Sequence, residues 1–167
     1  MEAKQGASYR IVIDISDTQG NWKDGALEAD LQGNLESHWP WTAIAAWPAK
    51  RYLRENYYKP VARIRTRVKS WSAGQDEYVL APTFLSSEGS YQCLVSDFTA
   101  QSTGELFLFV NDAIIYGTPD GVSPTYKNNS GEAQIFIKRI ASIGEPFALP
   151  PGMDGTSACK EFVFTPP

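Results

Sequence analysis

Short stretches of alternating apolar and polar residues recur along the chain and are separated by turn-forming residues. Tyr9, Ile11, Ile13 and Ile15 fall on one face of an extended segment, which is the period-two pattern of a half-buried strand. Further strands are expected at residues 61–68, 77–80, 92–99, 105–111, 133–140 and 161–164. Almost no helical period accompanies them, so the sequence predicts an all-β fold, either a β-sandwich or a jelly roll.

The length of 167 residues fits one domain that spans residues 1–167. Residues 142–167 are rich in Pro and Gly and are expected to form an irregular C-terminal strap. The longest apolar runs are far too short for a transmembrane helix, so we expect a soluble chain. The first residues contain no apolar signal-peptide core. This leaves a cytoplasmic protein or an excised periplasmic or extracellular domain.

The two cysteines, Cys93 and Cys159, lie too far apart in sequence for a zinc-binding motif and are too few for a disulfide scaffold. We expect two free thiols, with a single remote bridge as the alternative.

An aromatic segment interrupted by prolines covers residues 38–60. Pro48 can occupy the first turn of a short helix over residues 49–56, and the rest reads as an ordered loop. Trp39 and its neighbours could stack on a sugar ring, but large aromatic residues more often close one end of a sandwich. His38, the only histidine, is either a hydrogen-bond donor to a sugar or an ordinary loop residue.

Basic residues are concentrated in one segment. Residues 50–69 hold eight of the fifteen basic residues and one acid, so the segment has a net charge of +7 and the remainder −11. Arg63, Arg65 and Arg67 alternate with apolar residues, which indicates a strand with one basic, solvent-facing side. Anionic lipid or an acidic protein could bind there, whereas the acidic remainder argues against nucleic acid.

Polar residues cluster after the apolar run 105–110. Asn111 and Asp112 follow it directly, and Thr125, Asn128 and Asn129 precede the next predicted strand. The two segments are expected to bracket a loop at the ends of neighbouring strands, in a hairpin-like stretch over residues 105–140. Such residues are common in turns for capping reasons alone. The same carboxylate, amide and carbonyl oxygens are also the ligands that Ca²⁺ accepts.

These two segments resemble the calcium-dependent, galactose-binding bacterial lectins of the LecA family, most firmly over residues 104–140. The resemblance implies a β-sandwich of galactose-binding-like type. It also implies a calcium ion held by the side chains of Asp112, Asn128 and Asn129 and by the carbonyl of Thr125, with sugar hydroxyls completing the shell.

The chain departs from the family pattern in its loops. Twelve residues, 113–124, separate Asp112 from Thr125, where family members have only a few, and Lys127 replaces a glycine. Asp120, inside this insertion, is a candidate additional ligand. His38 and Trp39 lie roughly where the family has its sugar-contacting loop, and Asn111 is a further candidate for ligand contact.

The leading hypothesis is therefore a non-catalytic, calcium-dependent carbohydrate-binding module for galactoside-like sugars. The alternative is a LecA-like accessory domain without sugar binding, which acts as a protein-interaction module of a larger bacterial envelope or secretion-related protein. An enzyme is not expected, because the sequence has no phosphate-binding loop, metalloprotease motif or nucleophile elbow. A homo-oligomer is compatible with either hypothesis.

Overall fold

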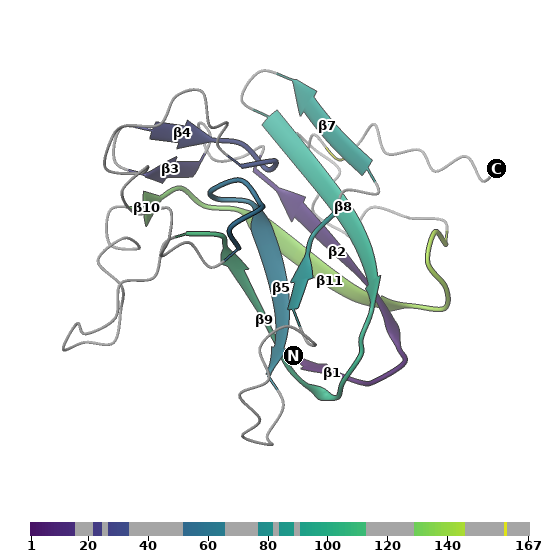
Figure 1. Cartoon of the computed structure of the whole chain (residues 1–167). Helices are drawn as coiled ribbons and strands as arrows, with labels where there is room; N and C mark the ends of the chain where they lie inside the picture. Colours follow the sequence, from purple (N-terminus) through teal and green to yellow (C-terminus); the bar gives the residue numbers. More distant parts are fainter. Residues whose placement is uncertain are drawn as a thin grey trace, which may run out of the picture.

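The computed structural model describes residues 1–15, 22–24, 27–33, 52–65, 77–81, 84–88, 91–112, 129–145 and 159. In these residues the regular structure consists of strands, and no α-helix occurs among them, which confirms the all-β class. The strands form two four-stranded antiparallel sheets and one small three-stranded sheet (Figure 1).

The first sheet has the order β11-β2-β8-β7. Its strands are β2 (Ser8–Asp14), β7 (Phe84–Glu88), β8 (Tyr91–Thr99) and β11 (Gln134–Ile140). β2 lies between β8 and β11 and pairs with both over its whole length. Tyr9, Ile11 and Ile13 point into the core, as the alternating sequence predicted.

The second four-stranded sheet has the order β1-β9-β5-β6. Its strands are β1 (Glu2–Ala3), β5 (Pro60–Arg65), β6 (Glu77–Val79) and β9 (Gly104–Val110). On β5, Ala62 and Ile64 are buried while Arg63 and Arg65 are exposed, so the predicted one-sided basic strand is confirmed over the described residues. Arg67 lies outside them.

The small sheet consists of β3 (Trp22–Asp24), β4 (Leu27–Ala29) and β10 (Asn129–Ser130), in the order β10-β3-β4. Figure 1 shows it at the end of the molecule toward which β9 points. The sequence did not predict β3 and β4, because a three-residue strand is too short to show alternation.

One hydrophobic core joins the two four-stranded sheets. Ile11, Ile13 and Leu94 contribute from the first sheet, and Ile64 and Leu106 from the second. All five side chains are at most 8% exposed. The arrangement is therefore sandwich-like, with a core between facing sheets.

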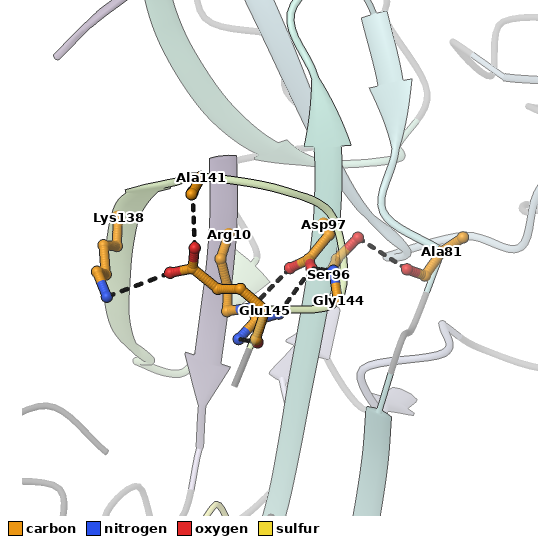
Figure 2. A network of polar contacts seen from close by, with 8 residues as sticks. All are labelled: Arg10, Ala81, Ser96, Asp97, Lys138, Ala141, Gly144 and Glu145. Atoms are coloured by element: carbon orange, nitrogen blue, oxygen red, sulfur yellow. Dashed lines mark hydrogen bonds and ion pairs between the residues drawn. The ribbon is translucent and has the colours of Figure 1, made fainter. Parts of the chain in front are cut away.

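The outer face of the first sheet is also largely buried, which the period-two pattern did not indicate. Arg10, on this face of β2, is 1% exposed. Its guanidinium donates from Nε and from a terminal nitrogen to the two carboxylate oxygens of Asp97, at 2.7 Å each. The turn after β11 covers the pair: the Glu145 carbonyl accepts from Arg10 at 2.8 Å, and the Gly144 amide donates to Asp97 at 2.9 Å (Figure 2).

The Glu145 side chain closes the same turn. Its carboxylate accepts a hydrogen bond from the Ala141 amide at 2.6 Å and lies 3.5 Å from the Lys138 ammonium. The Ala141 hydrogen bond, followed by the Lys138 interaction, lowers the pKa of Glu145 against the opposing effect of burial. The charged form of the carboxylate is therefore favoured, and its hydrogen bond to the Ala141 amide holds the turn that covers Arg10.

Cys93 and Cys159 form a disulfide bond, so the expectation of two free thiols is wrong. Their Cα atoms are 5.0 Å apart, within the normal range for a bridge, and both residues are completely buried. Cys93 lies opposite Asp14 in the β2–β8 register, on the outer face of the first sheet. The bridge thus attaches residue 159 of the C-terminal segment to this face.

The expectation of a short helix is also corrected. Residues 52–56, the described part of the predicted helix 49–56, form bends and turns with a Glu55-to-Tyr52 backbone hydrogen bond of 3.2 Å. The apolar strand β9 lies between β1 and β5 in its sheet. Phe107 is nevertheless 38% exposed on its outer side, whereas β2 is covered on both faces.

Candidate functional site

The segments that carry the predicted ligands do not form a hairpin. β9 pairs with β1 and β5 in one sheet, whereas β11 pairs with β2 in the other. The prediction that they are neighbouring strands is therefore wrong. In a sandwich, strands that follow each other along the chain can belong to opposite sheets, and the apolar pattern alone does not distinguish this case.

A turn at residues 30–33 nevertheless links the ends of the two sheets. On one side, the Leu31 amide donates to Oε1 of the buried Gln92 at 2.7 Å, next to the Ile15-to-Gln92 backbone bond that extends the first sheet. On the other side, Gly33 lies directly against residues 56–59. A Cβ on Gly33 would approach the Tyr57 carbonyl to 2.3 Å, and its φ of +87° also favours glycine. Both sheets thus end in one packed region.

Asn111 organises this region from the end of β9. Its side chain is completely buried. Oδ1 accepts from the Tyr52 amide at 3.0 Å, and Nδ2 donates to three carbonyls, those of Tyr52 (3.1 Å), Glu55 (3.3 Å) and Asn56 (2.9 Å). The whole amide is therefore used to hold the loop 52–56. The sequence suggested Asn111 as a ligand contact, but in the structure its side chain binds backbone.

Replacing Asn111 with Ala should lower the free energy of unfolding by roughly 2–3 kcal/mol, because it leaves buried backbone groups of the loop without partners. Asn56→Ala is the matched control, since its side chain makes one exposed 3.2 Å bond to the Gln32 carbonyl, and a surface substitution of this kind changes stability by about 0.5 kcal/mol or less. Urea unfolding followed by circular dichroism measures both. Equal losses for the two variants would show that Asn111 does not organise the loop.

Tyr58 adds backbone strain at the same place. It has a φ of 63°, in the left-handed region that is uncommon for non-glycine residues, and is only 3% exposed. Backbone bonds fix it: the Tyr58 amide donates to the Asn111 carbonyl at 2.7 Å, and the Asn111 amide donates to the Lys59 carbonyl at 2.9 Å. Strained residues of this type are concentrated at binding and catalytic sites.

Asp112 follows Asn111 and is 3% exposed. A carboxylate this buried requires hydrogen-bond donors or a cation to offset the loss of water. Its backbone position is set by the fixed residue before it. Of the four predicted calcium ligands, Asp112 is the one whose side chain the structure describes.

Of the remaining predicted residues, the structure describes only the backbone of Asn129. Asn129 begins β10, where its backbone pairs with Asp24 of β3, and its side chain is outside the description. His38, Trp39, Asp120, Thr125 and Asn128 lie outside the described residues. Within the described part of the chain no group of three or more His, Cys, Asp or Glu residues converges. A site with one carboxylate and several amide and carbonyl ligands does not require such a group.

Sequence reasoning missed Gly33, Tyr58 and Gln92. A glycine such as Gly33 indicates a turn in the sequence. The packing that requires it comes from residues 56–59, which are far away in sequence. Nothing in the sequence distinguishes Tyr58 from the other aromatic residues of this segment. Gln92 lies in a predicted strand, where an amide is expected to face solvent.

No protein-family model, curated protein or solved structure matches this chain. Among the described residues there is also no helix of the length and apolarity needed to cross a membrane. The geometry of this end of the sandwich and the residue pattern around it are therefore the features that point to a function.

Proposed function

We propose that the chain is a non-catalytic module that binds galactoside-like carbohydrate through a calcium ion held beside Asp112. The observation that carries the proposal is the burial of Asp112, 3% exposed, directly after the fixed Asn111. A buried carboxylate that follows a fixed residue is a suitable first ligand for Ca²⁺, which takes six to eight oxygens. The pattern Thr125, Asn128 and Asn129 supplies further oxygens of the kind that Ca²⁺ accepts.

The backbone around these residues supports the proposal. β9 ends at Val110, and β10 begins at Asn129 and is held by β3. The turn 30–33 ties the ends of both sheets together, so the ligand-bearing segments start from fixed points. When bound, calcium would supply a Lewis-acidic centre that orients sugar hydroxyls. Asp112 would supply the negative charge beside the ion, and the amide side chains would supply neutral oxygen ligands.

Isothermal titration with calcium, and then with galactose in the presence of calcium, tests the proposal. We expect heat from both ligands and none from galactose after chelation. Asp112→Asn should weaken calcium binding by at least about tenfold, because it removes the carboxylate from the ligand set. Asp30→Asn is the matched control, since Asp30 caps the Gln32 amide in the nearby turn, and it should leave both heats unchanged.

Two results would reject the proposal. One is the absence of heat from both ligands. The other is calcium binding that Asp112→Asn leaves intact, which would place the ion elsewhere. Circular dichroism of each variant shows whether a lost heat reflects unfolding instead.

A second function is favoured by the outer face of the sheet that contains β5 and β9. We propose as the alternative a protein-interaction module that uses this face, where Phe107 is 38% exposed and lies opposite Arg63 in the β5–β9 register. Arg65, the next outward residue of β5, is also exposed. An aromatic residue beside arginines is typical of protein interfaces. A partner captured equally well with chelator and with galactose present would favour this function over sugar binding.

The disulfide bears on the compartment in which either function operates. We infer that the chain works in an oxidising environment, such as a periplasm or an extracellular space, because disulfides persist there and are rare in the cytosol.

A further inference from the structure

Among the residues that the structure describes, β11 has an open edge. It is the outermost strand of its sheet, and of the described strands it pairs with β2 alone. The backbone bonds Ile15-to-Gln92 and Ala100-to-Ala7 show that the odd-numbered residues of β2 bond to β8, so its even-numbered residues bond to β11.

The register then assigns the hydrogen-bonding groups of β11. Gln134, Phe136 and Lys138 lie opposite even-numbered residues of β2 and use their main-chain groups there. The main-chain groups of Ile135 and Ile137 therefore point away from the sheet. No other strand of the described part of the chain covers them. Unpaired edges of this kind readily pair with another strand.

Along this edge, an exposed apolar side chain lies between an acidic and a basic one. Ile135 is 48% exposed, and Glu132 and Lys138 are exposed on either side of it. Ala133 and Ile137 both pack against the core, so the alternation continues through residue 133. Glu132 therefore lies on the same outer face as Lys138, and each is three residues away from Ile135.

We propose that β11 pairs antiparallel with β11 of a second copy of this chain, about a two-fold axis at Ile135. The two Ile135 side chains then lie opposite each other, and the main-chain groups of Ile137 pair with those of Ala133 of the second copy. The two four-stranded sheets join into one sheet of eight strands. The contact is isologous, which is the usual form of a homodimer interface.

Charge complementarity identifies the second copy as the partner. In this register each Lys138 lies opposite Glu132 of the second copy, so the symmetry produces two ion pairs. Lys138 can reach this contact, because its side chain is 54% exposed and its own-chain contact with Glu145 is long, at 3.5 Å. Arg139 falls opposite Gly131, so no cation opposes another cation. Opposite charges in cross-strand pairs stabilise a sheet, and like charges destabilise it.

Sedimentation of the full chain with chelator present tests the dimer, which does not depend on the proposed calcium site. We expect a concentration-dependent species of twice the 18.5 kDa chain mass between low and several hundred micromolar protein. Ile135→Lys places two cations together at the axis and should give a monomer at all these concentrations. Ile143→Lys is the matched control, because Ile143 is 53% exposed but lies beyond the paired segment, and it should leave the dimer intact.

A charge exchange tests the register. Glu132→Lys and Lys138→Glu should each weaken the dimer by about tenfold, since each replaces two attractive pairs with two repulsive ones. The double variant should restore the wild-type dissociation constant. A monomeric wild-type chain, a dimer that survives Ile135→Lys, or a double variant no tighter than the single ones would overturn the proposal. Circular dichroism confirms that each variant is folded.

Discussion

Replacing both cysteines with alanine lowers the free energy of unfolding by about 4 kcal/mol. The bridge joins residues separated by 66 positions, and the chain-entropy model gives a stabilisation of this size for a closed loop of that length. The loss is expected as a lower midpoint of urea unfolding together with a steeper slope, because the unfolded chain without the bridge is less compact and exposes more surface.

The control for this prediction is chemical. A reductant should lower the stability of the wild-type chain by the same amount and leave the double alanine variant unchanged. A thiol assay under denaturing, non-reducing conditions should detect no free thiol in the wild-type chain. Two reactive thiols together with stability that is indifferent to reductant would show that Cys93 and Cys159 are not bridged.

The sequence could not reveal this bridge, for a geometric reason. The pairing requires Cys93 to face outward from β8, and requires the C-terminal segment to return to that face. Alternation in β8 indicates which residues share a face, and Leu94 lies in the core. It does not indicate what covers the opposite face. A pair of cysteines far apart in sequence is therefore compatible with free thiols until the layers are known.

The strands themselves were largely predictable. β2, β5, β8, β9 and β11 overlap predicted segments, because each carries a run of apolar or alternating residues of sufficient length. The three-residue strand β6 also overlaps a predicted segment. The pairing of those strands was not predictable. β9 and β11 follow each other in the apolar pattern, but they lie in different sheets, and the choice depends on the contacts of whole sheets.

At the candidate site, the sequence likewise showed the types of residue but not the segments that pack against them. The polar residues at the end of β9 lie in a buried region. Asn111 and Asp112 are adjacent in sequence and both buried, at 0% and 3% exposure, but the described contacts of Asn111 are with the backbone of residues 52–56. Whether a polar side chain holds its own chain or a ligand depends on the loop packed against it, and that loop is remote in sequence.

Arg10→Met should be among the most destabilising single substitutions, with a loss of about 3–5 kcal/mol. The Arg10 and Asp97 side chains are each 1% exposed, and two 2.7 Å bonds join them. Removing the arginine takes the cation away from a buried carboxylate that keeps the hydrogen bond from the Gly144 amide. Urea unfolding of the variant measures the loss. Lys59→Met is the control, since its pair with Glu55 is partly exposed and should contribute less than about 1 kcal/mol.

The double variant Arg10→Met/Asp97→Leu separates the two contributions to this loss. If the cost of Arg10→Met is the penalty of an unpaired buried charge, removing the charge as well should recover most of it, as with other buried ion pairs replaced by apolar residues. Recovery should be incomplete, because the Glu145 carbonyl and the Gly144 amide lose their partners. Additive losses in the double variant would contradict this account, since they would mean that Arg10 and Asp97 stabilise the sheet independently. Incomplete recovery would instead identify the turn 141–145 as the element that the buried ion pair holds against β2.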